Sequence, residues 1–189
     1  MKKTISTDLT LTNIAKVMEL LTETPEQMEH LSKTLSEEQI RQPLGAGERS
    51  FAEDLAHLIH SEARTSEAIY LALLREEPLI PDIHSERQWG KLLRYDLFAC
   101  SELLAYFKLR RAVLLRVLES LTEEQWARSI REEGKKRKES VYWRARSLAI
   151  HELDHLMDIQ IKITRRADDP PKERNEQRNP NTSESPSLG

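Results

Sequence analysis

The chain has 189 residues and a formal net charge of −3, with 32% charged and 38% hydrophobic residues. This length favours one compact domain, and the composition is typical of a helix-rich domain with a solvated surface. Five glycines are few for glycine-rich phosphate loops, and the near-neutral charge argues against a dedicated nucleic-acid-binding protein. The single cysteine, Cys100, excludes an internal disulfide and fits a reducing cytoplasm.

We expect neither a targeting segment nor a membrane span. The first residues include two lysines, but no apolar stretch of the kind found in secretory signals follows them. Nowhere does an apolar run approach the roughly 18 residues that a membrane span needs. The sequence therefore predicts a cytoplasmic protein without a membrane or a nucleic acid as its partner.

The first half of the chain carries clear helix signals. Residues 9–21 show apolar periodicity, which predicts a helix before Pro25. The string Thr24-Pro25-Glu26-Gln27 combines an N-cap threonine, a proline at the first helical position and a glutamine three residues on, so a helix is expected to begin there. Ser50-Phe51-Ala52-Glu53 is a capping box, and the helix that it opens should end near Arg75.

The second half predicts two more long helices. Residues 89–121 are long enough for a helix of many turns. Thr122-Glu123-Glu124-Gln125 opens a short helix that carries Trp126. Ser140 is the expected cap of a last helix over residues 141–166, which the two prolines at positions 170 and 171 cannot continue.

These elements define an all-α protein. Residues 76–82 should be irregular because they contain two prolines, and no segment alternates over a strand length. We therefore predict a four-helix bundle with one or two short extra helices. From Asp168 onward Leu188 is the only large apolar residue, so residues 168–189 are expected to be a disordered tail. The bundle domain is assigned to residues 1–167.

The most informative histidines are His151 and His155. They lie four positions apart in the last predicted helix, so both imidazoles can reach one ion from the same face. Leu148 and Ile159 place the pair on an apolar stripe, where two buried imidazoles need a shared partner. The alternative is a pair of ordinary core or surface histidines. A third histidine close to this pair would favour a metal site over ordinary histidines. The second long helix offers two candidates, His57 and His60.

The string His151-Glu152-Leu153-Asp154-His155 also matches the H-E-x-x-H pattern of zinc proteases. Its surroundings disagree, because the extended form of that motif needs glycine where Asp158 stands and histidine where Ile161 stands. No strand precedes the helix to hold a peptide substrate. We therefore set the protease interpretation aside.

The segment Leu55-Ala56-His57-Leu58-Ile59-His60-Ser61-Glu62, with Ser50 before it, follows the pattern "Ser…Leu-x-His-Leu-x-x-x-Glu". This pattern, together with the order and spacing of several other segments, resembles the DinB/YfiT-like superfamily of metal-dependent enzymes. The resemblance extends over most of residues 20–166. The other matching segments are residues 24–28, 35–39, 44–50, 78–81, 107–111 and 121–126, with Trp89, His151, His155 and Gln160. One departure is Arg49, where the family commonly has tryptophan.

This resemblance implies a four-helix bundle with a three-histidine metal site at one end, and His57, His151 and His155 as its ligands. Three neutral imidazoles suit Zn, Ni, Mn or Fe, and three protein ligands leave a coordination position open. The resemblance further implies a hydrolase or a thiol S-transferase that acts on a small molecule, including a low-molecular-weight thiol, and a homodimer. A non-enzymatic metal-binding or stress-response bundle is the alternative function.

Two residue assignments stay open in the sequence. By helical periodicity His57 falls off the apolar stripe of its helix, which fits a ligand in a wet pocket and a solvent-facing histidine equally well. His60 lies nearer the apolar boundary and is the alternative third ligand. Glu152 is a weak candidate for a general base, and the alternative is a solvated acid or an ion pair with Arg144, Arg146 or Lys162.

Overall fold

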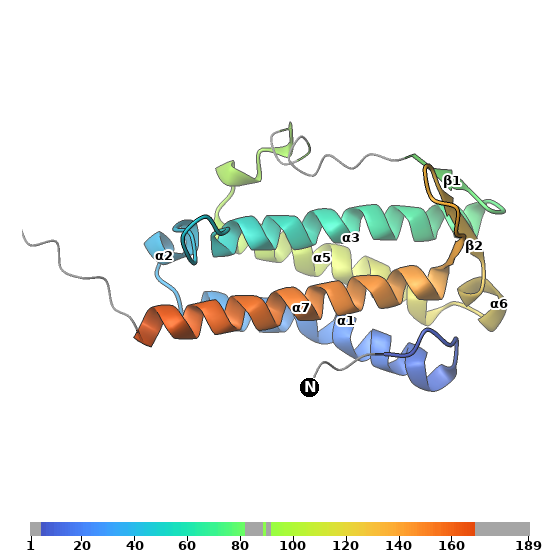
Figure 1. Cartoon of the computed structure of the whole chain (residues 1–189), viewed down its shortest axis with the longest axis horizontal. Coiled ribbons are helices and arrows are strands. Elements are labelled where there is room, and N and C mark those ends of the chain that lie inside the picture. Colours follow the sequence, from blue (N-terminus) through green and yellow to red (C-terminus); the bar gives the residue numbers. More distant parts are fainter. Residues whose placement is uncertain (1–4, 82–88, 90–91, 169–189) are drawn as a thin grey trace, which may run out of the picture.

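The computed structural model of the chain describes residues 5–81, 89 and 92–168 (Figure 1). Four long helices account for most of these residues, which confirms the predicted all-α four-helix bundle. The predicted tail lies outside the described residues except for Asp168, the last residue of the final helix. The elements are α1 (Leu11–Ser32), α2 (Glu37–Arg41), α3 (Phe51–Leu74), β1 (Leu79–Ile80), η1 (Tyr95–Leu97), α5 (Cys100–Glu119), α6 (Glu123–Trp126), β2 (Ser129–Glu132), β3 (Glu139–Ser140) and α7 (Val141–Asp168).

The long helices are not arranged in the order of the chain. Helices α1 and α3 each pack against both α5 and α7, so α1 lies diagonally across the bundle from α3, and α5 lies diagonally from α7 (Figure 1). A helix is thus a spatial neighbour of one that is distant in sequence. In particular, α3 and α7 lie side by side although more than 60 residues separate the end of one from the start of the other.

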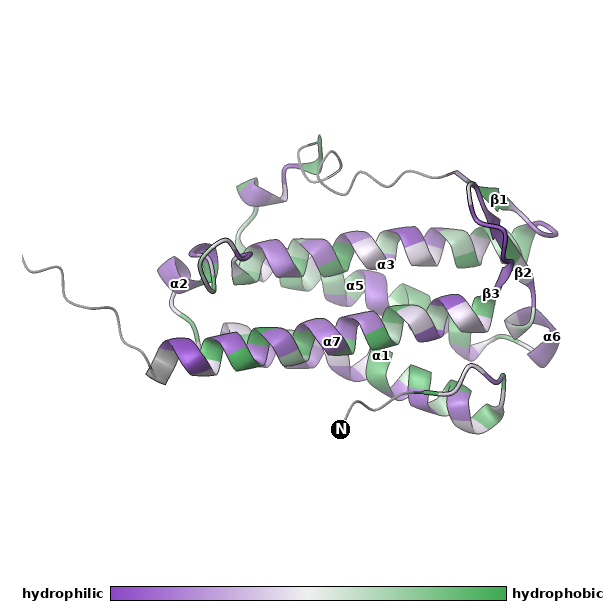
Figure 2. Ribbon diagram, viewed as in Figure 1, coloured by the Kyte–Doolittle hydropathy of each residue, from purple (hydrophilic) through white to green (hydrophobic). Residues whose placement is uncertain are grey.

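The bundle forms because each long helix is amphipathic. Green and purple segments alternate around α7 in Figure 2, as expected for a helix with one face in the core and the other in water. The buried side chains divide into two clusters along the bundle axis. One cluster contains Leu21, Ile69, Leu114, Leu118, Trp126, Tyr142 and Ala149, and the other contains Met28, Phe51, Leu55, Ile59, Phe107, Leu156 and Ile159.

The prediction that a helix begins at Thr24 is wrong. Helix α1 continues from Leu11 to Ser32 with Pro25 inside it. Proline has no N–H and removes the hydrogen bond that the carbonyl four residues earlier, that of Leu21, would otherwise receive. The fold tolerates this loss because a side chain from another helix donates to that carbonyl, as described below.

The third long helix begins later than predicted. Helix α5 starts at Cys100, and the preceding described residues contain the short η1 helix instead of a continuation of α5. Arg94 adopts the left-handed region with φ 51° and separates the helical residues 92–93 from η1, and the extended Ala99 separates η1 from α5. The Glu102 carboxylate accepts a hydrogen bond from the Ala99 amide, which fixes the start of α5.

The structure also contains a small sheet that was not predicted. Strand β1 pairs in parallel with β2, which pairs antiparallel with β3. These strands have two to four residues, too few for alternation to be detected in sequence. The sheet lies at the end of the bundle where α7 begins, and Ser140 in β3 accepts a hydrogen bond from the Trp143 amide (Figure 1). Ser140 therefore caps α7 as predicted.

Candidate metal centre

His57 occupies the second turn of α3, and the start of that helix is firmly fixed. The Ser50 hydroxyl accepts from the Glu53 amide while the Glu53 carboxylate accepts from the Ser50 amide, which completes the predicted capping box. Phe51 and Leu55 are fully buried in the first turns of the helix. This combination of cap and packing sets the rotation of α3 and turns His57 toward α7.

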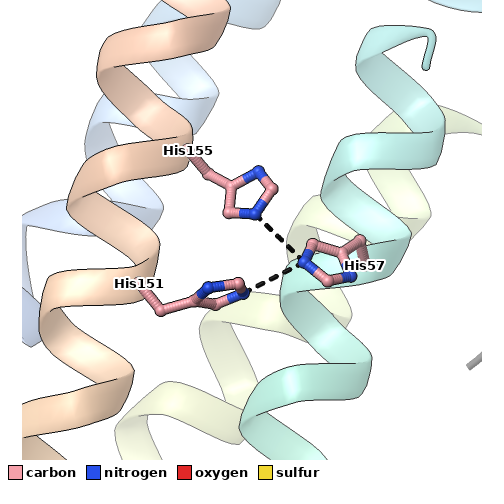
Figure 3. Close-up of side chains that lie close together, drawn as sticks. All are labelled: His57, His151 and His155. Carbon is pink, nitrogen blue, oxygen red and sulfur yellow. Dashed lines mark hydrogen bonds between the residues drawn. The ribbon is translucent and has the colours of Figure 1, made fainter. Parts of the chain in front are cut away.

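The other two imidazoles come from α7. His151 and His155 lie one helical turn apart on the same face, as their spacing predicts. Leu148, Leu156 and Ile159 are buried around them, so this part of α7 is packed on the bundle while both rings are half-buried. Figure 3 shows the two rings facing the single ring from α3.

The three imidazoles converge through the same ring nitrogen. His57 Nε2 lies 3.0 Å from His151 Nε2 and 3.1 Å from His155 Nε2 (Figure 3). Each of these three residues offers a ligand atom within 4.8 Å of the other two. A tetrahedral ion held by imidazoles at about 2.0–2.1 Å would place its ligand nitrogens about 3.3 Å apart. The spacing therefore fits a single small cation.

Mutual hydrogen bonding does not explain this arrangement well. A neutral imidazole carries one N–H donor and one acceptor, so three Nε2 atoms directed at one point bring at least two like groups together. The ring centroids lie 4.5–5.0 Å apart in tilted or edge-on geometry, which gives no extended stacking. A cation between the nitrogens is the arrangement that satisfies all three at once.

Two polar side chains of α3 border the cluster. Asp54 Oδ1 lies 3.8 Å from His155 Nδ1, the nitrogen opposite the converging one, and 3.7 Å from the Arg49 guanidinium. Asp54 is only 4% exposed, and burial raises the pKa of its carboxyl to about 6. Ser61 Oγ lies 3.4 Å from His151 Nε2. A carboxylate behind a histidine and a hydroxyl beside the cluster are common around protein-bound metals.

His60 lies apart from the cluster. It is 8% exposed, and its ring centroid is 6.1 Å from that of Trp89. Of the two candidates that sequence offered for the third position, the structure brings His57 to the α7 pair. His30 is exposed on α1 and lies outside the cluster, and His84 falls outside the described residues.

The interpretation of Glu152 as a solvated acid is wrong. Its side chain is fully buried, and its Oε1 accepts a hydrogen bond of 2.5 Å from Arg111 Nη2. Neighbouring positions of a helix point about 100° apart, so Glu152 faces the bundle axis while His151 faces α3. The geometry gives no support to Glu152 as a general base at the cluster.

Arg111 joins all four long helices, and sequence reasoning missed it. From α5 its guanidinium donates to Glu62 on α3 at 3.0 Å, to Glu152 on α7, and to the Leu21 carbonyl on α1. The side chain is 2% exposed and lies over the Phe107 ring at 5.0 Å. A usable signal existed, because Arg111, Glu62 and Glu152 each interrupt the apolar stripe of their helix.

This ion cluster forms a charged layer between the two hydrophobic clusters. Arg111 lies between Phe107 of one cluster and Leu114 of the other along α5. Burial raises the pKa of Glu62, which also faces Arg110 at 3.4 Å, and burial raises the pKa of Glu152 to about 7 against the effect of Arg111. The layer therefore ties α3 to α7 close to the three histidines.

The fold and the cluster together define a four-helix bundle with three convergent histidines on two neighbouring helices. A family model of the DinB superfamily matches residues 20–159, and the chain belongs to this superfamily. Among curated proteins, none matches the chain significantly.

A solved structure gives the same arrangement of helices. The chain superposes on YfiT from Bacillus subtilis with a TM-score of 0.78 and 19% sequence identity, over 86% of this chain and 92% of that one. YfiT is described as a probable metal-dependent hydrolase with an unusual four-helix bundle topology. At this identity the likeness establishes the shared fold. No helix in the described part of our chain combines the length and apolar character needed to cross a membrane.

Proposed function

We propose that His57, His151 and His155 bind one divalent cation through their Nε2 atoms and that the protein is a metal-dependent enzyme. The observation that carries this proposal is the convergence of three Nε2 atoms from two helices, with two of the separations at 3.0 and 3.1 Å. Neutral imidazoles suit Zn, Ni, Mn or Fe. Three protein ligands leave at least one coordination position for a small molecule, which distinguishes a catalytic from a structural site.

The side chains around the cluster have separable roles in this proposal. Asp54 faces His155 Nδ1 and would hold the proton on that nitrogen, which keeps Nε2 free as a ligand. Ser61 would contribute a hydroxyl to a polar group of the substrate beside His151. When bound, a divalent cation at such an open site supplies a Lewis acid that lowers the pKa of water or of a thiol.

Hydrolysis of a small-molecule substrate is the reaction that we favour. The structural relative YfiT is described as a probable metal-dependent hydrolase, and the open three-histidine arrangement suits a water nucleophile. Transfer to a low-molecular-weight thiol is the second candidate, because a thiolate would take the same position and the resemblance noted in the sequence implies it. Binding of the ion without turnover, as in a stress-response bundle, is the non-enzymatic alternative.

Metal content is the first test. The purified chain is stripped with a chelator, dialysed separately against Zn, Ni, Mn and Fe(II), and analysed for bound metal. We expect one ion per chain for at least one metal, and its loss in His151→Ala. The matched control is His30→Ala, which removes an exposed histidine outside the cluster and should keep full binding. Equal binding by His151→Ala, with native circular dichroism, would contradict the proposal.

Turnover is the second test. The metal-loaded chain is assayed on a panel of esters and amides for hydrolysis, and on monobromobimane with small thiols for transfer. Hydrolase activity should disappear in His57→Ala and persist in His30→Ala. Thiol conjugation without hydrolysis would favour the transferase. Stoichiometric metal without activity on either panel would favour the non-enzymatic alternative.

Two predictions from sequence stay predictions here. The first is a cytoplasmic location, to which the buried free thiol of Cys100 gives modest support. The second is a domain over residues 1–167 with a disordered tail over residues 168–189. Limited proteolysis followed by mass spectrometry would locate that boundary.

A further inference from the structure

The loop before α3 places a positive charge beside the histidine cluster. Arg49 is the last residue before the cap of α3, and its guanidinium lies 3.7 Å from Asp54 Oδ1. The same oxygen lies 3.8 Å from His155 Nδ1. One carboxylate oxygen therefore lies between the guanidinium and an imidazole of the proposed metal site. The Arg49 side chain is 43% exposed and that of Asp54 only 6%, so the guanidinium is the member of the pair that a dissolved molecule can reach.

The backbone around Arg49 is held in place by the loop over residues 43–50. The Leu44 amide donates to the Arg49 carbonyl at 3.0 Å, and Pro43 forms an antiparallel bridge with Ser50, so the two ends of the loop are tied together. Leu44 is buried in one of the two hydrophobic clusters, which fastens the loop to the bundle. In Figure 1 the loop lies between α2 and the start of α3. The position of Arg49 is thus set before any ligand binds.

A second positive charge, that of Lys162 on α7, has a different role. Its Nζ lies 3.0 Å from a carboxylate oxygen of Glu48 in the loop and 2.6 Å from one of Asp158 on α7. The side chain is 18% exposed, and these two carboxylates compensate its charge. Lys162 therefore fastens the loop to the helix that carries His155. The more exposed Arg49 is the better candidate for contact with a solute.

We propose that Arg49 binds a carboxylate of the substrate whose reacting group lies at the three histidines. This inference rests on the proposed function and names its substrate class, a small ester or amide that carries a carboxylate. The planar guanidinium offers paired N–H donors that match the two oxygens and the single charge of such a group. Three neutral imidazoles do not neutralise a divalent cation, which further favours a negatively charged substrate.

Two hydroxamates that differ in charge test the inference by isothermal titration calorimetry. The probes are 4-carboxybenzohydroxamate and 4-carbamoylbenzohydroxamate, which share a metal-binding hydroxamate and an aromatic ring. The chain is loaded with the metal that binds stoichiometrically. The wild type should bind the carboxylate probe at least about tenfold more tightly than the carboxamide probe, because hydrogen bonds between charged groups are stronger than those between neutral ones. Equal affinity for the two probes would overturn the inference.

Substitution of Arg49 separates recognition from support of the site. Arg49→Gln should abolish the preference for the carboxylate probe and leave the affinity for the carboxamide probe unchanged. Arg49→Lys keeps the charge without the planar fork and should show an intermediate preference. The matched control is Arg75→Gln, which removes an exposed cation at the opposite end of α3 and should keep the full preference. An equal loss of affinity for both probes in Arg49→Gln would mean that Arg49 only compensates the charge of Asp54, and would overturn the inference.

Turnover gives the same comparison on the two esters 4-acetoxybenzoate and 4-acetoxybenzamide. Arg49 would contact a group remote from the reacting bond, so Arg49→Gln should raise KM for the carboxylate ester much more than it lowers kcat. The kinetic constants for the carboxamide ester should not change. A fall in kcat/KM of the same size for both esters would contradict recognition of the carboxylate.

The outcomes also distinguish this inference from the proposed function. A chain that binds no metal under any loading condition would overturn both. Stoichiometric metal together with equal affinity of the wild type for the two hydroxamates would overturn this inference alone. Metal content and circular dichroism, measured on the same samples, show whether Arg49→Gln keeps the ion and the fold. If that variant does not fold, the wild type and Arg49→Lys still decide the question.

Discussion

The guanidinium of Arg111 on α5 donates to the Leu21 carbonyl on α1, the acceptor that Pro25 leaves without its helical donor. A proline inside one helix and an arginine on another are thus complementary parts of one arrangement. The same guanidinium binds the buried carboxylates of Glu62 and Glu152. Each of its partners belongs to a different helix, so the orientation of the whole bundle depends on this side chain.

Replacing Arg111 with methionine should strongly destabilise the fold. Glu152 and the Leu21 carbonyl would remain buried without the guanidinium, and Glu62 would keep only Arg110 at 3.4 Å. Breaking a buried ion pair from one side costs about 3–5 kcal/mol. The free energy of unfolding measured in urea checks this. Lys16→Met, which removes an exposed cation from α1, is the control and should change it by about 0.5 kcal/mol or less.

The link between Arg111 and Pro25 can be measured separately. Pro25→Ala restores an N–H that can donate to the Leu21 carbonyl. The effect of Pro25→Ala on the free energy of unfolding should therefore be about 1 kcal/mol more favourable in the Arg111→Met variant than in the wild type. This difference is the typical net value of one hydrogen bond. Strict additivity of the two substitutions would show that the Leu21 carbonyl does not connect them.

Asp54→Asn should weaken metal binding without unfolding the protein. The carboxylate faces His155 Nδ1, and loss of such an outer partner typically costs 10–100-fold in affinity. Competition with a chromogenic chelator gives the dissociation constants. Asp158→Asn is the matched control, because that carboxylate is exposed on α7 and pairs with Lys162. If both variants bind equally tightly, Asp54 does not support the site.

Stability should fall as the pH rises from about 4.5 to about 7. Burial raises the pKa of Glu152 from its ordinary value of 4.5 to about 7, so the folded chain retains a proton that the unfolded chain releases. The stabilisation that protonated Glu152 gives the folded state is fully present below pH 4.5 and is lost as the pH rises through about 7. The free energy of unfolding should fall by at most about 1.4 kcal/mol per pH unit in this range. Glu152→Gln should flatten this part of the profile.

Metal-free protein should be used for this comparison. All other titratable groups are common to the wild type and the variant, so the difference between the two urea profiles isolates the contribution of Glu152. Identical slopes would mean that Arg111 keeps this carboxylate ionised across the range.

Ser50→Ala should lower the free energy of unfolding by about 1 kcal/mol, which is the usual contribution of an N-cap side chain. The Ser50 hydroxyl accepts from the Glu53 amide at 3.2 Å, and the alanine substitution removes this acceptor while the Glu53 carboxylate can still accept from the amide of residue 50. Thermal unfolding is the measurement. Ser50→Thr keeps a hydroxyl and should be close to wild type, so an equal loss in both variants would point to packing instead of capping.

Local signals in the sequence predicted the helices well where caps define them. The box at Ser50 and the cap at Ser140 lie where they were expected. The capping pattern at Thr24 gave a wrong helix start, because these residues lie inside α1. A proline is tolerated there since a side chain of another helix donates to the Leu21 carbonyl in place of the missing N–H. That donor is Arg111, 90 residues away, and no local pattern contains it.

Local signals also predicted one part of the three-histidine cluster and left another part open. The spacing of His151 and His155 predicted that they share a face, whereas helical periodicity left His57 and His60 undecided. His57 was favoured by resemblance alone, and the structure brings it to the other two because α3 and α7 are neighbours. That adjacency is a property of the bundle topology, which helix propensities do not encode.

The diagonal connection of the helices also affects synthesis of the protein. His57 and His151 are separated by 94 positions, so the ribosome must release nearly the whole bundle before the three nitrogens can meet. A nascent chain that ends before α7 contains His57 but neither of the other two proposed ligands. In the proposed site, the cation would therefore be bound only after α7 has been made and has packed against α3.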